Sequence, residues 1–163
     1  MKTIDLQTQV TFERIMLATD FFPAAKIAQA YAVGLALHDS STLEVATVVD
    51  LSLTLPSMDV ISESALEALR HSSEEGLRRL AERISGVRVT RKVIEGFLPA
   101  SLLVDEAVNT NADLIVLGTT SKHGLKKLVL GSTAEEVIRT APCPVLTVGP
   151  HVSLPNFPVF FQR

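Results

Sequence analysis

The sequence has few of the features that mark secreted, membrane-bound or disulfide-linked proteins. Its single cysteine, Cys143, excludes a disulfide within the chain and suits a reducing compartment. No apolar run approaches the roughly 20 residues that a membrane-spanning helix needs, and the first ten residues lack the apolar stretch of a signal peptide. We therefore expect a cytoplasmic protein without a membrane partner.

Positive charge is scarce outside one loop. The net charge is −3 at pH 7, yet three lysines and no carboxylate lie between Gly118 and Ser132. The rest of the chain therefore has a net charge of −6. An acidic body with one basic loop argues against general nucleic-acid binding and favours a small anion bound locally.

The composition is that of an ordinary globular protein. The chain has 163 residues, of which 47% are hydrophobic and 20% charged, enough for one domain with a sizeable core. Strand-like and helix-like segments alternate, which predicts an α/β fold: an open five-stranded parallel sheet with helices on both faces. No linker or repeat divides the chain, so we expect one domain over residues 12–149 and a tail over residues 150–163.

Apolar patterning places the expected elements. The expected strands are 14–19, 43–49, 87–94, 114–117 and 144–148, and the four helices begin near 23, 64, 99 and 133. The third strand alternates valines with charged or polar residues, which predicts a half-exposed strand at a sheet edge. Ser64 and Ser132 each precede a glutamate by three residues, which predicts a capping box at each position. Gly86 is expected to end the second helix, in which the serine pair 72–73 is a candidate kink.

The candidate binding site lies where two strands end. Ligands of open α/β sheets bind beyond the strand carboxyl ends, at the point where the strand order reverses. With the strand order 3-2-1-4-5, that point lies between the first strand, which leads to Asp20, and the fourth, which ends at Gly118. The basic loop then runs to a helix N-terminus, where amides and the helix dipole favour a phosphate. The alternative is a solvated basic loop beside an ordinarily capped helix.

Six short stretches carry a resemblance to a known family. They are residues 14–21, residue 96 with 99–100, and residues 113–119, 124–125, 130–132 and 141–146. On these the chain resembles the universal stress protein family over residues 12–149. The resemblance implies an adenine-nucleotide-binding α/β sandwich that is usually a dimer, with a role in stress response or regulation.

The family's ATP-binding branch has a glycine, two residues, a second glycine, nine residues, and then a glycine followed by serine or threonine. Gly118 matches the first glycine, and Gly131 with Ser132 matches the closing pair, but Ser121 replaces the middle glycine. A side chain there can hinder the approach of backbone to phosphate, although its hydroxyl and amide can also donate to phosphate. Two functions stay open: a protein that binds ATP or a related adenine nucleotide, and a nucleotide-free dimeric interaction module. Phe22 is a second departure, because the family often has a serine at that position.

The resemblance also implies which residues form the site. Asp20 would lie near the ribose or adenine, beside the backbone of the two residues before it. Of the other positions, one would contact the adenine, two would line the floor of the site, two would lie on the phosphate side and three would form the phosphate cradle. In chain order the set is Ala18, Thr19, Asp20, Val48, Leu117, Gly118, Thr120, Ser121, Gly131, Ser132 and Thr133. The ligand would be ATP, ADP or AMP, and Mg²⁺ would accompany ATP through phosphate oxygens and water.

The sequence does not predict an enzyme. Asp20, His123 and Ser132 suggest a hydrolytic triad, but the serine lacks the second glycine of a nucleophile elbow. The four histidines are scattered and there is no second cysteine, so we expect no metal site in the protein itself. No strong general base accompanies the loop, so any ATP hydrolysis is expected to be slow.

The last strand and the tail bear on whether the chain forms a dimer. Residues 145–148 carry no charge, and a bare strand edge tends to be paired or covered. The resemblance implies pairing of this edge with a second copy, so we expect a homodimer through residues 144–148. The tail holds Phe157, Phe160 and Phe161, which we expect to be docked, the alternative being a frayed terminus. The signalling partner does not follow from the sequence.

Overall fold

The computed structural model describes residues 10–54, 63–119 and 131–153, which form one parallel sheet with the strand order β3-β2-β1-β4-β5. The strands are β1 (Arg14–Ala18), β2 (Thr42–Asp50), β3 (Arg88–Gly96), β4 (Leu114–Gly118) and β5 (Val145–Val148). Every neighbouring pair is parallel. The predicted fold class and strand order are thus confirmed.

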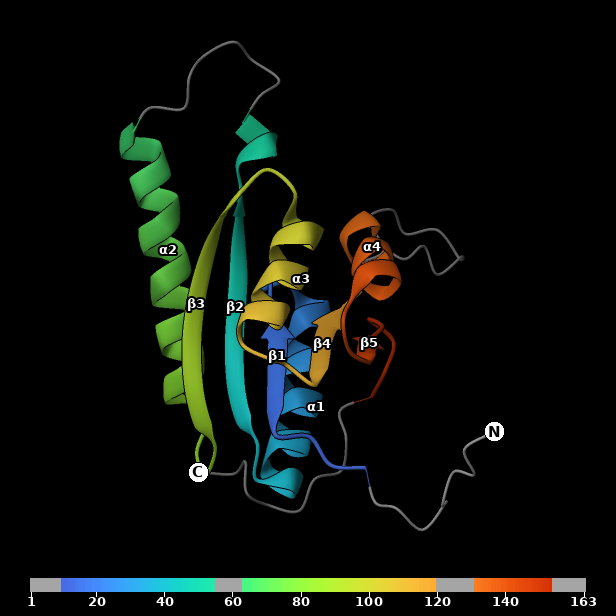
Figure 1. Cartoon of the computed structure of the whole chain (residues 1–163). Coiled ribbons are helices and arrows are strands. Elements are labelled where there is room, and N and C mark those ends of the chain that lie inside the picture. The colour runs from blue at the N-terminus through green and yellow to red at the C-terminus, as the bar shows by residue number, and fades with distance from the viewer. Residues whose placement is uncertain (1–9, 55–62, 120–130, 154–163) are drawn as a thin grey trace.

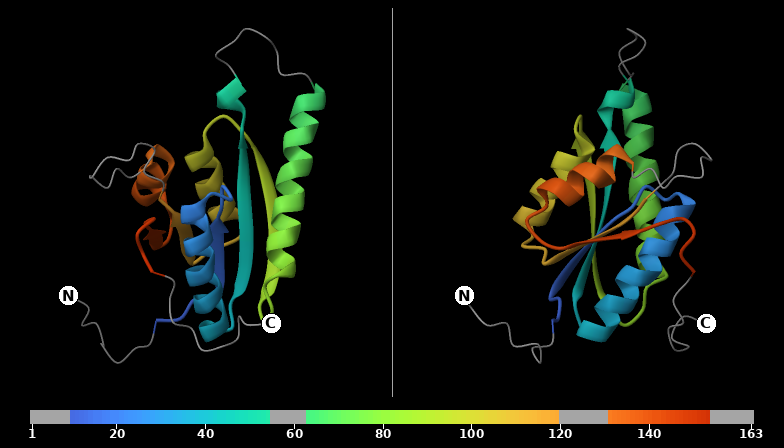
Figure 2. Two further views of the ribbon diagram at one scale, coloured as in Figure 1. Left: turned by 180° about the vertical axis from the view of Figure 1, so that it is seen from behind. Right: turned by 90° about the vertical axis from the view of Figure 1, so that its right-hand side faces the viewer.

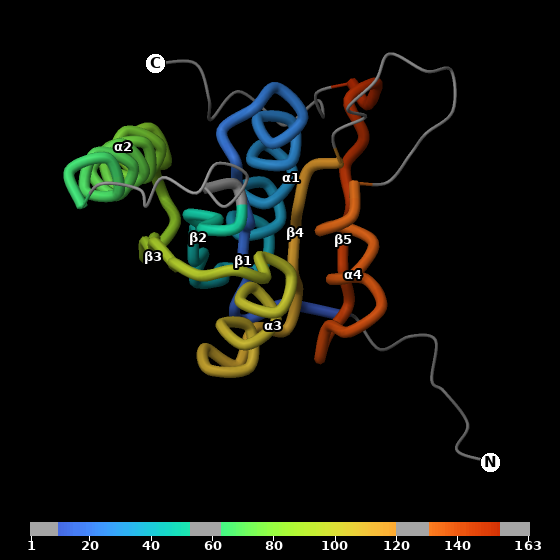
Figure 3. Tube along the Cα trace, turned by 90° about the horizontal axis from the view of Figure 1, so that it is seen from above, coloured from blue at the N-terminus to red at the C-terminus, as the bar shows by residue number. Residues whose placement is uncertain are grey.

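Helices cover both faces of the sheet (Figure 1). The helices are α1 (Pro23–Asp39), α2 (Glu63–Glu82), α3 (Pro99–Asn109) and α4 (Ser132–Thr140), with a short 3₁₀ helix, η1 (Leu51–Thr54), after β2. Seen from above, α1 and α2 lie on one side of the strands and α3 and α4 on the other (Figure 3). The right-hand view of Figure 2, seen from the β5 side, shows the same two layers of helices on either side of the strands. Within the described ranges, no helix has both the length and the apolar character needed to cross a membrane.

The side chains of the central strand β1 are divided between two hydrophobic cores, one on each face of the sheet. Ile15 and Leu17 belong to the cluster beneath α1 and α2, whereas Met16 and Ala18 belong to the cluster beneath α3 and α4. All four are buried. A strand covered on both faces reads as a continuous apolar run, as residues 15–18 of β1 and 114–117 of β4 do.

Strand β3 is an edge strand, as its alternating pattern predicted. Val89 and Val93 pack against the core beneath α1 and α2, while Arg88, Thr90 and Lys92 are exposed. Charged side chains along an exposed edge oppose pairing with a foreign strand. The exposed charged side chains of β3 therefore protect this edge of the sheet against pairing with another chain.

Helix α2 differs from the prediction at both ends. It begins at Glu63, so Ser64 lies inside its first turn instead of capping it, and it ends at Glu82 instead of at Gly86. Gly86 has a φ of 78° and lies in the connection to β3, where a left-handed conformation suits glycine. The serine pair at 72–73 does not interrupt the helix, because α2 is continuous through it.

Candidate functional site

A gap opens between β1 and β4 because the chain leaves these two strands in opposite directions. Beyond β1, the amide of Thr19 donates to the Ala46 carbonyl of β2 at 2.9 Å. Beyond β4, the amide of Thr119 donates to the Val148 carbonyl of β5, also at 2.9 Å. Each segment continues the ladder with its outer neighbour. The carboxyl end of the sheet is therefore open at the reversal point of the strand order, where the sequence predicted a site.

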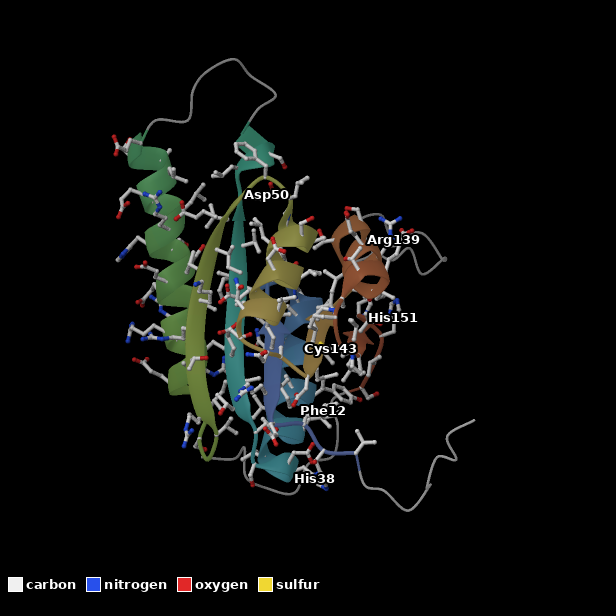
Figure 4. All side chains as sticks on the ribbon, viewed as in Figure 1. Phe12, His38, Asp50, Arg139, Cys143 and His151 are labelled. Atoms are coloured by element: carbon white, nitrogen blue, oxygen red, sulfur yellow. The ribbon has the colours of Figure 1, made fainter. Side chains whose placement is uncertain are left out.

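Strand β2 forms a side wall of this opening. Ala18, the last residue of β1, lies opposite Ala46, and β2 continues past it to Asp50. Thr47 and Val48 thereby extend beyond the end of β1 and reach the cleft. Figure 4 shows Asp50 at this carboxyl end of β2 and His38 at the opposite end of the molecule.

The opening is a cleft of about 300 Å³. Its lining includes eight of the eleven predicted residues, which come from the ends of β1, β2 and β4 and from the start of α4. They are Thr19, Asp20, Val48, Leu117, Gly118, Gly131, Ser132 and Thr133. Ala18 is not among them, because its side chain is packed in the core beneath α3 and α4. Thr120 and Ser121 lie outside the described residues, as does the basic part of the loop, so their predicted roles stay predictions.

Six further residues line the cleft that sequence reasoning did not assign to it. They are Phe22, Ala46, Thr47, Pro99, Leu103 and Ala134. Three of them, Phe22, Pro99 and Ala134, come from the first turns of α3 and α4 or from the residue before α1. The proline that opens α3 was a usable signal, since it marks a helix start and helix starts lie at the carboxyl ends of parallel strands. Ala46 and Leu103 read only as core residues.

The Asp20 carboxylate is partly engaged with its own loop. Its Oδ1 accepts a hydrogen bond from the amide of Phe22 at 3.0 Å, which holds the turn before α1. Thr19 supports the same turn, because its hydroxyl oxygen accepts from the Phe21 amide at 3.1 Å and from the Gln29 side chain at 3.2 Å. Asp20 is exposed, and its Oδ2 has no partner among the described residues. That oxygen is available to a hydroxyl donor of a ligand.

Gly118 ends β4 where the first turn of α1 crosses it. A Cβ at this position would lie 2.7 Å from the carbonyl carbon of Ala24 and from the backbone nitrogen of Ala25. Neither backbone atom can move without moving α1. The absence of a side chain therefore lets α1 approach β4 and bring the Asp20 turn to the cleft.

The start of α4 corrects the predicted capping box. Gly131 is the N-cap, and its carbonyl accepts from the Glu135 amide at 3.0 Å, so Ser132 is the first helical residue and not the cap. The amides of Ser132, Thr133 and Ala134 therefore have no acceptor within the helix. Because Ser132 does not cap the helix, its exposed side chain remains beside these amides at the cleft.

Among the helices that begin at the cleft, α4 offers the best anion site. Helices α1 and α3 both begin with a proline, which has no N–H to donate. Helix α4 begins with three residues that retain their amides and has its dipole directed toward the cleft. The start of α4 is therefore better suited to an anion than the other two helix starts.

A larger groove, of about 490 Å³, lies between α2 and β3. Its walls include Arg78 and Glu75, which already pair with each other at 2.8 Å. Glu75 also pairs with Arg79. The hydrogen bonds from Arg78 and, to a smaller extent, from Arg79 lower the pKa of Glu75 to about 2. The groove lies at the outer edge of the sheet, away from the strand reversal. The smaller cleft therefore remains the candidate site.

Within residues 10–54, 63–119 and 131–153, no three His, Cys, Asp or Glu side chains gather as metal ligands would. Cys143 is half-buried against the core beneath α3 and α4, and burial raises the pKa of its thiol, with a further contribution from the charge of Asp113. It therefore packs as a small apolar group. A cation in the cleft would therefore be coordinated by a bound ligand and not by a cluster of these side chains.

Comparisons with known proteins agree on one family. The profile of the universal stress protein family matches residues 11–149. The universal stress protein MJ0531 of Methanocaldococcus jannaschii is 35% identical over 144 residues, which cover 84% of this chain and 82% of that protein. The solved structure of the hypothetical protein MJ0577 has the same fold, with a TM-score of 0.76 at 24% identity over 88% of this chain and 100% of that one. A universal stress protein solved in complex with cAMP has a TM-score of 0.64 at 22% identity, over 85% of this chain and 98% of that one.

Proposed function

The chain belongs to the universal stress protein family, and we propose that it is a cytoplasmic stress-response or regulatory protein that binds an adenine nucleotide in the cleft between β1 and β4. The observation that carries this proposal is that Asp20 and the first turn of α4 line the same cleft. A carboxylate on one side and helix amides without an acceptor among the described residues on the other match a ligand with hydroxyl donors and an anionic group.

The lining suggests how such a ligand would lie. The phosphate would accept hydrogen bonds from the amides of Ser132 and Thr133, and a ribose hydroxyl would donate to Asp20 Oδ2. The base would occupy the apolar part of the cleft, which is formed by Ala46, Val48 and Leu103. A cavity of about 300 Å³ is at the small end of the range for ligand sites. The ligand would be ATP, ADP or AMP, with Mg²⁺ carried on the phosphates of ATP.

A family member that holds cAMP supports an adenine ligand but leaves the number of phosphates open. The first experiment is mass spectrometry of ligand released from the purified protein, followed by titration calorimetry with ATP, ADP, AMP and cAMP. The proposal expects saturable binding of at least one of them at a stoichiometry of one per chain. The absence of both released nucleotide and binding heat would reject it.

A variant then assigns the binding to the cleft. Asp20→Asn keeps an oxygen that can accept from the Phe22 amide but removes the charge and one acceptor, so the affinity for the nucleotide should fall about tenfold, the loss of one charge-assisted hydrogen bond. Asp105→Asn, on the exposed face of α3 and away from the cleft lining, is the matched control and should bind as the wild type does.

The second candidate is a nucleotide-free dimeric interaction module, favoured by Ser121 at the position of the middle glycine. In that case calorimetry would show no binding, and Ser121→Gly would create it. Neither candidate is a fast enzyme. Asp20 is the one carboxylate among the described residues of the cleft, and it is engaged with its own turn, so we expect at most slow ATP hydrolysis.

Both candidates include a homodimer through β5. The strand carries no charged residue, and Val145, Leu146 and Thr147 are partly exposed at the edge of the sheet. An uncharged edge strand is a template for pairing with another chain. Pairing of two β5 strands across a two-fold axis would join the two sheets and cover both edges.

A further inference from the structure

We propose that Phe22 is a base-stacking residue of the cleft and that it contributes affinity for the nucleobase rather than for the phosphate. This inference rests on the proposed function, because it assigns a residue to the same site. Phe22 lines the cleft and yet the residue is 61% exposed. A phenylalanine that remains so exposed gains little from folding, and its ring is accessible to a ligand in the cleft.

Phe22 is also a poor residue for the helix that it precedes. It occupies the N-cap of α1, where serine, threonine, aspartate or asparagine would accept a hydrogen bond from the first turn. The structure has no side-chain cap at this position. The chain therefore forgoes a helix cap and exposes an aromatic ring at the same residue. Both costs are explained if the ring contacts a ligand.

The opposite wall of the cleft completes the argument. Phe22 precedes α1, whereas Pro99 begins α3, and these helices lie on opposite faces of the sheet (Figure 3). Both residues line the cleft. A group bound above the strand ends therefore lies between an aromatic ring on one side and a proline ring on the other. A flat, apolar group with two exposed faces fits that arrangement, and a nucleobase is such a group.

Phosphate recognition belongs to other residues. The amides that no described residue accepts from lie in the first turn of α4, and a phenylalanine side chain offers no donor to an anion. Removal of the ring should therefore weaken adenosine and AMP by the same factor. A residue that acted on the phosphate would weaken AMP alone.

The test begins with calorimetry of the wild type, Phe22→Ala, Phe22→Leu and Phe22→Tyr with adenosine and AMP. Loss of one base–aromatic stack should raise the Kd of both ligands about tenfold in the alanine variant. The leucine variant keeps apolar bulk without the flat face and should be weakened almost as much, whereas tyrosine should restore binding to within about twofold. Phe97→Ala is the control, because Phe97 is 55% exposed and is not among the residues that line the cleft.

A second measurement reports contact directly. The chain has no tryptophan, so Phe22→Trp would carry the single indole of the protein. Stacking on adenine should quench its fluorescence, with a midpoint equal to the calorimetric Kd, while Phe97→Trp should show no change. Circular dichroism of each variant shows whether it is folded.

The outcomes separate this inference from the proposed function. Wild-type binding together with unchanged affinity in the alanine and leucine variants would overturn the role of Phe22 and leave the nucleotide site intact. Weakening of AMP without weakening of adenosine would also overturn it. Failure of the wild type to bind any adenine compound would reject the proposed function and this inference with it.

Discussion

The ring of Phe21 lies directly against Gly76 of α2. A Cβ on that glycine would be 2.8 Å from Cζ of the phenylalanine and within 3.2 Å of two neighbouring ring atoms. Phe21 has a φ of 63°, an uncommon conformation for a bulky residue. The residue between Asp20 and Phe22 is therefore turned away from the cleft and anchored on a helix more than fifty positions later in the chain.

Gly76→Ala tests this anchor. Alanine is the better helix former by about 1 kcal/mol, so on propensity alone the variant would be more stable. Phe21 packs against the core beneath α1 and α2 and cannot retreat freely, so we expect the free energy of unfolding to fall by about 1 kcal/mol. Denaturant titration measures it. In a Phe21→Ala background the same substitution should be stabilising, and a stabilising effect in both backgrounds would contradict the contact.

Gly118→Ala should be more damaging than Gly96→Ala, although both glycines end strands. The added methyl group at Gly118 would meet the backbone of α1, whereas at Gly96 it would meet the Cδ1 atom of Leu102 at 2.8 Å. A leucine terminus can rotate, but a helix backbone cannot. We expect a loss of about 2–3 kcal/mol at Gly118 and less than about 1 kcal/mol at Gly96 in unfolding titrations. Equal losses would show that α1 does not depend on the close approach.

These residues show how far the sequence predicts the site. The parallel sheet followed from the alternation of buried strands and helices, and the presence of Asp20 and Gly131 in one cleft followed from the expected strand order and the rule that ligands bind where that order reverses. Patterns of this kind are repeated over many residues, so an error at one position does not change the result. The fold and the place of the cleft were therefore predictable.

Single-residue features were less predictable. Ser132 and Glu135 have capping-box spacing, yet Gly131 takes the cap, because the chain enters α4 one residue earlier. The role of Gly118 in helix packing depends on a contact with Ala24, and no local pattern encodes a contact across 94 positions. In the sequence, Phe22 stood out only as a departure from the serine that the family often has at that position. Its exposure in the cleft required the three-dimensional structure.

Phe22→Ser should make the unliganded protein more stable. Serine at the N-cap of α1 can accept a hydrogen bond from the first turn, worth about 0.5–1 kcal/mol. Little is lost with the ring, because Phe22 is mostly exposed. Thermal unfolding without ligand should show a higher Tm, and Phe97→Ser, which does not create a cap, should not. A lower Tm for Phe22→Ser would mean that the ring packs in the folded protein.

Glu44→Gln should also be stabilising, but only at a pH where the Glu44 side chain is ionised, such as pH 7. Burial raises the pKa of Glu44, and the nearby charge of Glu106 raises it further while Lys92 opposes the shift. One carboxylate oxygen, Oε1, is buried without a hydrogen-bond partner among the described residues. A carboxyl with a raised pKa in the folded state binds more protons folded than unfolded, so stability falls as pH rises through about 4.5 and above.

We therefore expect Glu44→Gln to raise the free energy of unfolding by about 0.5–1 kcal/mol at pH 7 and to have no effect at pH 3. Glu75→Gln should behave in the opposite way. The pKa of Glu75 is lowered to about 2, so its contribution is present above pH 4.5 and is lost as pH falls toward 2. Urea titrations of both variants at pH 3 and pH 7 give the comparison. The same sign for both at pH 7 would contradict the two environments.

Thr147→Pro tests the proposed dimer edge without breaking the sheet. The carbonyls of Pro144 and Val148 accept hydrogen bonds from Ile115 of β4 and from Thr119 just beyond it, at 3.0 and 2.9 Å. Because backbone groups alternate in direction along a strand, residues 145 and 147 direct theirs to the outer edge. Proline at 147 would remove an outward N–H and is tolerated in an edge strand. Sedimentation should then show a folded protein with the mass of one chain, where the wild type and Thr147→Val show twice that mass. A wild type that sediments as one chain would reject the dimer, and a dimeric proline variant would place the contact elsewhere on the molecule.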